Sequence, residues 1–475
     1  MLTFYPWPEL VVSLAEAIAW IVIATGLLQT SFYLVQLCFA AVSLSQRPPA
    51  TGASLLWRRY ADQAPPIAVL APAYNEEVTI VESVASLLAL HYPDFEVVVI
   101  NDGSTDATLQ RLIEHFGLSP VERFHDLTVG HRPIRGLYAS ARLPRLLVID
   151  KSNGGKSDAL NAGINLARAP LFCSIDADSI LENDALLRAV RPFIDDPDKM
   201  VAVGGTVRLA NGCRIEGGRV IKVSLPRNFL ALVQIMEYLR AFLMARLALS
   251  RMQALTVISG AFGLFRRRLV LEVGGYSHGT VGEDMELVVK LHRHMRELGR
   301  PYRVEFIPEP VCWTEAPESL AVLGRQRARW QRGALETFSK HRDMLFNPRY
   351  GRIGFVGFGQ ILVTDVIGPF VEVAGYVLVP VLWLAGMLAF DFLLAFLAIT
   401  FTFGIFVSVT TLILEEFELR RFPRASDLLV LTLVAIVENF GYRQLCNFWR
   451  MRGVWQFFRK HEGWGQMPRK GFQAT

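Results

Sequence analysis

Two long apolar segments flank a region in which short hydrophobic runs alternate with amphipathic ones. The first apolar segment covers residues 10–43 and is interrupted mainly by Glu16. A helix of about 20 residues crosses a bilayer, so this segment predicts one long tilted helix or, as the alternative, two short ones. Arg47, Arg58 and Arg59 follow it directly. Because positive charge accumulates on the cytoplasmic side of membrane helices, we expect the next part of the chain to lie in the cytoplasm.

The second apolar segment covers residues 353–440. Its pattern predicts spanning helices near residues 376–390, 392–414 and 428–440. The stretch 355–372 contains Asp365 and Glu372, which favours a position in the membrane interface. The basic and aromatic tail at 447–475 is typical of a helix that lies on a cytoplasmic leaflet. The whole chain is therefore expected to have about four to six spans.

The region between the apolar segments has the pattern of an α/β domain. Buried strands are predicted at residues 67–75, 96–102, 146–151 and 171–179. Segments with helical spacing of apolar residues follow the first three strands, and this alternation predicts a parallel sheet wound with helices. Ligands of such sheets bind at the carboxyl ends of the strands. AYNEE, NDGSTD and DADS lie at these ends, which is the first indication of a functional site.

Composition agrees with a soluble domain joined to membrane helices. Hydrophobic residues make up 52% of the 475 residues and the mean hydropathy is +0.31, whereas charged residues still make up 20%. The net charge of +5 is mild, so no nucleic-acid partner is indicated. The five cysteines are scattered without metal-ligand spacing. They indicate a reduced, cytosol-facing protein with neither a disulfide framework nor a zinc site.

The tripeptide DAD at residues 176–178 closes the last predicted strand. Side chains alternate along a strand, so Asp176 and Asp178 are expected to point the same way, towards the ligand edge. Two carboxylates there can hold Mg²⁺ or Mn²⁺, which prefer oxygen ligands and are commonly shared with phosphates. The alternative is that one aspartate only caps the next turn.

Two further motifs suit a nucleotide. NDGSTD at residues 101–106 places Asp102 where its carboxylate could hold a uracil or a ribose, although the same residues are common in turns. NGGKSDALNAG at residues 153–163 offers glycines that let the backbone approach a ligand, and Lys156 for phosphate charge. The segment lacks the Walker pattern, which disfavours ATP chemistry.

The two remaining motifs are GED at residues 282–284 and GRQRARWQRG at residues 324–333. Asp284 precedes a clear helix and is either a helix cap or a general base that takes a proton from an attacking hydroxyl. The arginine-rich stretch lies shortly before the second apolar segment. It is either a basic patch against anionic lipid or a site that holds a phosphate and stacks a ring.

In this order, APAYNEE, NDGSTD, NGGKSDALN, DAD, GED and QRARW resemble the motifs of family 2 membrane glycosyltransferases. The resemblance covers residues 65–345, and QxxRW at residues 326–330 looks like the signature of the processive synthases of cellulose, chitin, hyaluronan and poly-N-acetylglucosamine. It implies a GT-A-like, Rossmann-like α/β domain in the cytoplasm, inserted between amino- and carboxyl-terminal transmembrane helices. The implied segments are a membrane segment at 1–46, the transferase domain at 65–345, membrane and interfacial helices at 353–446, and a basic tail at 447–475.

The same resemblance implies a role for each motif residue. Those expected around the uridine diphosphate are Ala73, Asn75, Glu76, Asp102 and Lys156. Asp176 would meet the sugar nucleotide and the metal, and Asp178 is the favoured direct ligand of Mg²⁺ or Mn²⁺. Asp284 would be the base, with Glu283 beside it. Those expected at the acceptor and pyrophosphate are Gln326, Arg329 and Trp330. Arg325, Arg327 and Arg332 are left to face lipid headgroups.

The implied enzyme is an inverting hexosyltransferase in the inner membrane. It would use a UDP-sugar to extend a β-linked exopolysaccharide or oligosaccharide acceptor, coupled to export and with accessory synthase subunits. Resemblance to bacterial poly-N-acetylglucosamine synthases favours UDP-N-acetylglucosamine, with UDP-glucose as another possible donor. Two alternatives remain: a non-processive transferase to a lipid acceptor, and a non-catalytic partner in an exopolysaccharide complex. GED in place of TED or SED and an insertion at 118–145 depart from the family pattern.

Overall fold

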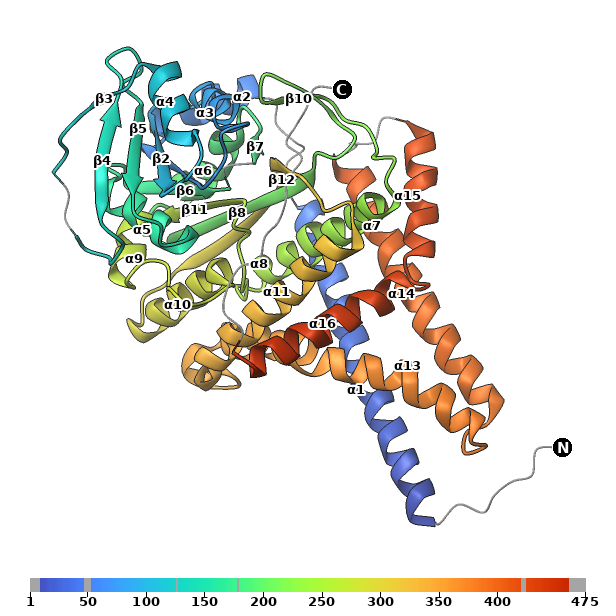
Figure 1. The fold of residues 1–475 in the computed structure, drawn as a ribbon. Helices are drawn as coiled ribbons and strands as arrows, with labels where there is room; N and C mark the ends of the chain where they lie inside the picture. The colour runs from blue at the N-terminus through green and yellow to red at the C-terminus, as the bar shows by residue number, and fades with distance from the viewer. Residues whose placement is uncertain (1–8, 47–52, 125–126, 177–178, 420–423, 461–475) are drawn as a thin grey trace.

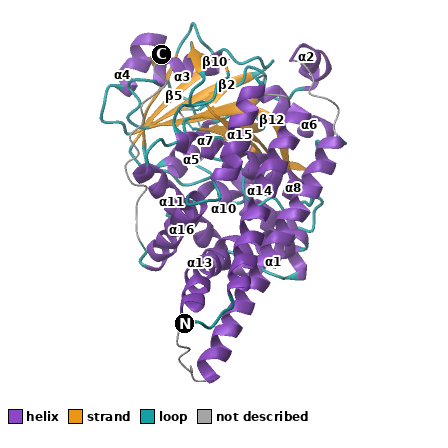
Figure 2. Ribbon diagram, turned by 90° about the vertical axis from the view of Figure 1, so that its right-hand side faces the viewer, coloured by secondary structure: helices purple, strands orange, loops and turns teal. Residues whose placement is uncertain are grey.

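The computed structural model describes residues 9–46, 53–124, 127–176, 179–419 and 424–460, and it has two distinct parts. A twisted sheet covered by helices lies at one end, and helices α1 (Glu9–Ser45), α13 (Gly368–Leu384) and α14 (Phe390–Leu419) extend away from it (Figure 1). The turned view separates the strands from this helical part in the same way (Figure 2). The two parts are those that the change in sequence pattern predicts.

Four parallel strands form one half of the sheet. They are β1 (Ile67–Ala73), β2 (Phe95–Asp102), β5 (Leu146–Lys151) and β6 (Leu171–Ile175), in the spatial order β5-β2-β1-β6. All their pairings with one another are parallel, as predicted. Helices cover both faces of such a sheet, so its strands are buried on both sides and read as continuous apolar runs. In β5 every residue is buried.

The rest of the sheet departs from the all-parallel prediction. Among the described residues, ten strands form one mixed sheet in the order β3-β4-β5-β2-β1-β6-β11-β8-β12-β7. The added strands are β3 (Ser119–Pro120), β4 (Ile134–Ala139), β7 (Ile180–Leu181), β8 (Met200–Leu209), β11 (Phe262–Arg266) and β12 (Arg303–Thr314). β11 is antiparallel to both β6 and β8. The insertion at 118–145 supplies β3 and β4, which extend the sheet antiparallel beyond β5.

Helices cover the sheet and connect it to the helical part. Those of the α/β domain are α2 (Ala53–Tyr60), α3 (Ile80–Leu88), α4 (Thr108–Phe116), α5 (Lys156–Leu166), α6 (Ala185–Asp195), α9 (Arg267–Glu272) and α10 (Glu283–Glu297). Those at the junction are α7 (Phe229–Tyr238), the π-helix η2 (Leu239–Arg246), α8 (Leu247–Arg251) and α11 (Leu320–Lys340). A two-stranded hairpin, β9 (Arg214–Glu216) and β10 (Arg219–Lys222), stands apart from the main sheet.

The described residues include three helical segments long and apolar enough to cross a membrane. They are Ala17–Ser45, Ile353–Leu384 and Phe396–Phe417, and a bent pair, α15 (Ala425–Val437) with α16 (Tyr442–Phe458), would make a fourth. The amino-terminal segment is one helix, so the alternative of two short helices is wrong. Among the described residues the count is therefore three, below the predicted four to six, or four if the bent pair is one span.

The second apolar segment divides differently from the prediction. η5 (Ile353–Gly357), α12 (Phe358–Ile361), η6 (Leu362–Ile367) and α13 form one continuous helical run, so the stretch 355–372 belongs to a candidate span. That run ends at Leu384, before the Gly386 φ of 73°, and the predicted helix at 376–390 is therefore too long. Glycine reaches this left-handed conformation without steric cost, which marks the turn into α14.

Candidate active site

The loops that follow β1 and β2 are joined by hydrogen bonds. The Asn75 N–H donates to Ser104 Oγ at 3.0 Å, and Asn75 Oδ1 accepts from the Thr105 N–H at 2.8 Å. The Glu76 N–H donates to Thr108 Oγ1 at 2.9 Å. Asn75 has a φ of 55°, a left-handed conformation that asparagine tolerates better than most residues. The motifs AYNEE and NDGSTD therefore form one fixed edge of the site.

Asp102 is held by the loop that precedes α5. Its carboxylate accepts from the backbone N–H of Gly154 at 3.0 Å and of Gly155 at 2.7 Å. The fully buried Lys151 lies between two carboxylates, with Nζ at 2.6 Å from Asp102 Oδ1 and 2.5 Å from Asp158 Oδ1. A buried ion needs such partners because desolvation is costly. This cluster fixes the NGGK segment relative to the end of β2.

The insertion at 118–145 reaches the same cluster. The backbone N–H of Arg132 donates to both oxygens of Asp158, at 3.0 and 2.9 Å. The side chain of Asn165 on α5 exchanges two hydrogen bonds with the backbone of Val129, at 3.2 and 2.8 Å. The insertion thus secures α5 as well as widening the sheet.

Lys156, the first residue of α5, is surrounded by acidic side chains. Its Nζ lies 2.5 Å from Asp176 Oδ1 and 3.2 Å from the carbonyl oxygen of Gly260. The N–H of Gly260 donates to Asp284 Oδ2 at 3.2 Å, and the N–H of Met285 donates to Asp284 Oδ1 at 2.8 Å. Gly282, not Asp284, is the residue at the helix cap of α10. The backbone of Gly260 therefore holds the predicted base beside the predicted phosphate ligand.

This cluster of charges shifts the pKa of two of its members. Burial raises the pKa of Glu283 to about 7, against the opposing charge of Lys156, and Asp284 adds to the increase. Burial would lower the pKa of Lys156, but Asp176 and Glu283 outweigh it and raise that pKa above its ordinary value. Glu283 is 3% exposed, and its Oε2 has no hydrogen-bond partner within the described residues. Perturbed groups of this kind are concentrated at functional sites.

The GED and QxxRW motifs are brought together by two glycines. A Cβ placed on Gly282 would lie 2.9 Å from the Cα of Gly333, and one placed on Gly333 would lie 2.8 Å from the Cα of Gly282. The N–H of Val281 and the hydroxyl of Thr280 both donate to Glu336 on α11, at 3.0 and 2.9 Å. This close crossing gives a physical reason for glycine where the family pattern has threonine or serine.

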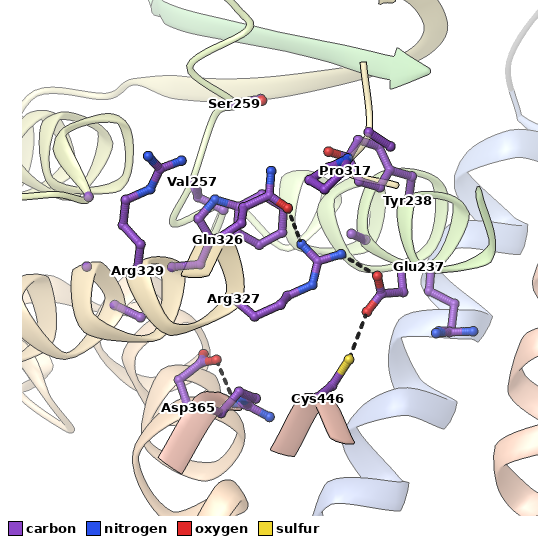
Figure 3. Close-up of a pocket in the computed structure, with 18 of the residues that line it drawn as sticks. Glu237, Tyr238, Val257, Ser259, Pro317, Gln326, Arg327, Arg329, Asp365 and Cys446 are labelled. Carbon is purple, nitrogen blue, oxygen red and sulfur yellow. Dashed lines mark hydrogen bonds and ion pairs between the residues drawn. The ribbon is translucent and has the colours of Figure 1, made fainter. Parts of the chain in front are cut away.

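Helix α11 directs part of its arginine-rich face inward. Arg327 is 7% exposed, forms an ion pair with Glu237 and donates to Gln326 Oε1 at 2.9 Å (Figure 3). Its guanidinium carbon lies 4.4 Å from the ring centroid of Trp330, which is 45% exposed. Arg332 is buried as well. The expectation that Arg327 and Arg332 face lipid headgroups is therefore wrong, because both pack inside the protein.

Residues of these motifs line one cavity of about 2060 Å³. The predicted site residues that line it are Ala73, Asn75, Glu76, Asp102, Lys156, Asp176, Glu283, Asp284, Gln326, Arg329 and Trp330. The cavity continues between the candidate membrane helices, where Gln29, Glu372 and Phe403 also line it. Asp178, the predicted metal ligand, lies outside the described residues. Within the described part, no group of three or more potential metal-binding side chains is present.

Several cavity residues were not predicted from the sequence. Tyr74 is 50% exposed beside the nucleotide edge, and Glu237 anchors Arg327 from α7. Arg246 at the end of η2 also lines the cavity. A signal for Glu237 and Arg246 was present, because EYLRAFLMAR at residues 237–246 places charged residues inside an otherwise apolar helix.

Comparison with known proteins agrees with this geometry. Residues 68–274 match the family model described as glycosyl transferase family 2. The poly-beta-1,6-N-acetyl-D-glucosamine synthase of Staphylococcus epidermidis strain RP62A is 30% identical over 283 residues, which cover 60% of this chain and 58% of the relative. The synthase of the same name from Staphylococcus aureus strain COL is 30% identical over 275 residues, 58% of this chain and 56% of the relative. The chain thus spans less than two thirds of these relatives.

A solved structure shares the fold. The mannosyltransferase PcManGT from Pyrobaculum calidifontis, in complex with GDP-Man and Mn²⁺, has a TM-score of 0.55 and 19% sequence identity. The superposition covers 94% of this chain and all of that one (100%). At this identity the likeness concerns the fold alone. The match of residues 68–274 to the glycosyl transferase family 2 model, the strand order and this shared fold agree on a GT-A-like α/β domain in that part of the chain.

Proposed function

We propose that this chain is an inverting membrane glycosyltransferase that extends a β-linked polysaccharide with sugars from a UDP-sugar. The observation that carries the proposal is the single cavity that joins the nucleotide edge, Asp284 and Trp330 to the candidate membrane helices. A soluble transferase needs no passage between apolar helices. A synthase that elongates a chain and passes it into a membrane needs one.

The comparisons favour N-acetylglucosamine as the sugar. The two staphylococcal relatives are named as poly-beta-1,6-N-acetyl-D-glucosamine synthases. Their printed names support UDP-N-acetylglucosamine as the donor, with UDP-glucose as the second donor to test. The complex of PcManGT with GDP-Man and Mn²⁺ supports a nucleotide sugar with a divalent cation in this fold.

Asp284 is the proposed general base. Backbone N–H groups of Gly260 and Met285 hold its two oxygens, and this fixes the carboxylate within the cavity. It would take the proton of an acceptor hydroxyl while that oxygen attacks the anomeric carbon opposite the leaving diphosphate, which inverts the configuration. General-base catalysis of this type contributes about 10²–10⁴-fold. Glu283, buried directly beside it, would hold a proton near neutral pH because of its raised pKa.

Positive side chains would stabilise the leaving diphosphate. Lys156 lies at the amino-terminal end of α5, where backbone N–H groups and the helix dipole also favour an anion. Arg329 faces the same cavity from α11 (Figure 3). Trp330, half-exposed beside it, offers a flat surface on which an acceptor sugar ring can stack. Fixed charges of this kind stabilise negative charge that develops during the reaction.

The residues present suit a divalent cation. The carboxylate oxygens of Asp176 include Oδ2, which lies outside the contact with Lys156. Together with Asp178 these oxygen donors are the type that Mg²⁺ and Mn²⁺ prefer. Asp176 and Asp178 would hold the ion, which supplies positive charge to the diphosphate.

The membrane arm of the cavity, defined here as the part lined by Gln29, Arg240, Glu372 and Asn447, is the proposed path of the product. Gln29 Nε2 donates to Glu372 Oε1 at 2.8 Å, and Asn447 donates to the other oxygen of the same carboxylate. Arg240 forms an ion pair with the buried Glu438. Polar groups between apolar helices are costly and commonly mark a pathway. Sugar hydroxyls can exchange hydrogen bonds with such a lining.

The test uses the full chain, purified and reconstituted in lipid nanodiscs with Mg²⁺ or Mn²⁺. UDP-N-acetylglucosamine, UDP-glucose and UDP-glucuronate are supplied separately, and UDP release and product size are measured. We expect UDP release with UDP-N-acetylglucosamine, a product of many lengths, and loss of activity after chelation with EDTA. A product with one added sugar on a lipid would support the non-processive alternative. No UDP release with any donor would support a non-catalytic partner.

A further inference from the structure

Arg246 is the last residue of the π-helix η2, and its environment differs from that of the other cavity arginines. Arg240, Arg327 and Arg450 each form an ion pair, with Glu438, Glu237 and Asp365 respectively. Within the described residues Arg246 forms no ion pair within 4.0 Å. Its Nη1 is buried and has no hydrogen-bond partner among them. Since a buried unpaired donor costs free energy, this one is suited to a ligand.

The orientation of this guanidinium is restricted by an aromatic ring. Its central carbon lies 3.9 Å from the ring centroid of Phe242, one helical turn earlier in η2, and Phe242 is itself buried. A planar guanidinium stacked on a ring presents its N–H groups at the edge, in a fork that matches two neighbouring oxygen atoms. π-helices are rare and occur frequently at functional sites.

Arg246 also lies in the electrostatic field of the proposed base. Burial lowers the pKa of Arg246 to about 10, and the negative charge of Asp284 is the strongest influence that opposes this shift. The group remains cationic at neutral pH. Arg246 and Asp284 line the same cavity. They can therefore contact the same ligand.

Arg246 lines the cavity from a different element than the proposed nucleotide residues. η2 packs against the candidate membrane helices α1 and α14, whereas Lys156 and Asp176 come from the carboxyl edge of the sheet. Tyr238, next to Glu237 at the start of the same π-helix, also lines the cavity (Figure 3). The ligand on this side is the acceptor, because the diphosphate is placed at Lys156.

We propose that Arg246 binds two neighbouring oxygen atoms of the terminal acceptor sugar and so directs the reacting hydroxyl towards Asp284. The inference rests on the proposed function and adds a residue that contacts the acceptor. Hydroxyl and acetamido carbonyl oxygens are both suitable acceptors of its N–H groups. A hydrogen bond from a charged donor contributes about 10- to 100-fold in binding.

The experiment compares Arg246→Met and Arg246→Lys with the wild-type chain in nanodiscs. The acceptor is a β-1,6-linked N-acetylglucosamine oligosaccharide, and the donor is UDP-N-acetylglucosamine. KM for the acceptor, the Kd for UDP, and the slow hydrolysis of donor without acceptor are measured. We expect Arg246→Met to raise the acceptor KM about 10- to 100-fold, with the Kd for UDP and the hydrolysis rate within about twofold of wild type. The lysine variant should fall between the two, because it keeps the charge but lacks the fork.

Arg251→Met is the matched control. Arg251 follows five residues later at the end of α8, is exposed, and donates to Gln46 on the surface. It should leave all three quantities unchanged. An unchanged acceptor KM in Arg246→Met, or a lysine variant equal to wild type, would contradict the proposal. A UDP Kd that rises as much as the acceptor KM would place Arg246 at the diphosphate and also overturn it. If the wild-type chain transfers no sugar, the proposed function fails instead.

Discussion

At the scale of single residues, the carboxylate of Asp284 is positioned by the backbone and not by another side chain. Both of its oxygens accept from N–H groups, at 3.2 Å from Gly260 and 2.8 Å from Met285. An asparagine has the same shape and keeps an oxygen that can accept one of these bonds. The substitution therefore removes the base without removing the support.

Asp284→Asn should lower the rate of sugar transfer by about 10²–10⁴-fold. Lys156, the proposed diphosphate ligand beside Asp284, keeps its contact with Asp176 in this variant, so the Kd for UDP should stay within about twofold of wild type. Initial rates of UDP release and calorimetric titration with UDP check the two parts. Transfer at the wild-type rate would exclude Asp284 as the base.

Glu286, two residues after Asp284, joins α10 to the end of α11. Lys340 Nζ donates to its Oε1 at 2.7 Å, and His341 Nε2 lies 3.3 Å from the same oxygen. Burial raises the pKa of Glu286, but the hydrogen bonds from His341 and Lys340 and the charge of Lys290 outweigh burial and lower the pKa to about 2. The ionised carboxylate therefore stabilises the fold.

The pH dependence follows from that shift. A carboxyl group with a lowered pKa in the folded state contributes stability above its ordinary pKa of 4.5, and the contribution is lost as pH falls from there to about 2. Glu286→Gln should cost about 3 kcal/mol at pH 7, and the difference should shrink on acidification. Tm values of the two proteins at pH 7, 4 and 3 test this. Glu297→Gln on the same helix, at a more exposed ion pair, should change Tm little at any pH.

At the scale of elements, the crossing of α10 and α11 fixes the proposed base, Asp284, relative to the proposed acceptor platform, Trp330. The crossing depends on the absence of side chains at Gly282 and Gly333, whose backbones are in contact. In a helix interior, alanine is normally more stable than glycine by about 1 kcal/mol. Gly333→Ala should do the opposite, because its Cβ would lie 2.8 Å from the Cα of Gly282 and the two elements must separate.

The expected result of Gly333→Ala is a lower Tm together with a lower rate of transfer. Gly359→Ala is the control, since a Cβ there would meet only Phe346, at an ordinary 3.5 Å. Thermal unfolding and UDP release measure the two effects. A Gly333→Ala variant that is more stable and equally active would mean that the crossing tolerates separation.

The sheet and helix α11 show which features the sequence predicts and which it does not. β1, β2, β5 and β6 were predicted because strands buried on both faces leave an unmistakable apolar run. The motif residues at their ends were predicted with them. The burial of Arg327 was not, because its partner Glu237 lies 90 positions earlier in the chain and on another helix. Arginines that pair across a fold have the same sequence signal as arginines that face lipid.

The carboxyl-terminal helix is a second example. Its aromatic and basic residues predict a helix on the membrane surface, and Phe448, Trp455 and Phe458 are indeed exposed. Its other face packs along α11, where Arg450 Nε donates to Gln331 Oε1 at 2.9 Å. The buried residues of this helix are Tyr442, Asn447, Trp449, Gly453 and Val454. Because aromatic residues lie on both faces, the sequence does not show which face packs inward. α16 thus supports the helix that carries QxxRW.

At the scale of the whole molecule, one cavity connects the proposed nucleotide site with the proposed path of the product, and different kinds of groups line the two. The end proposed for the nucleotide is built from backbone N–H groups and charged side chains at the edge of a sheet. The membrane arm is built from apolar helices with the paired polar groups Gln29–Glu372 and Arg240–Glu438. A product that leaves through the arm must pass α14, where Thr400 and Phe403 line the cavity. Narrowing the arm at α14 should therefore limit elongation of the product without preventing the first transfer of a sugar.

Thr400→Trp tests this separation, because an indole at a lining position reduces the free width while leaving the sheet edge untouched. We expect the Kd for UDP to stay near wild type and the product to become several-fold shorter on a sizing gel. Leu394→Trp is the matched control, since Leu394 lies on the same helix and is 48% exposed. Full-length product from Thr400→Trp would exclude this arm as the path. In inverted membrane vesicles, polymer made by the wild-type chain should accumulate in the lumen, and polymer found only outside would contradict export through the helices.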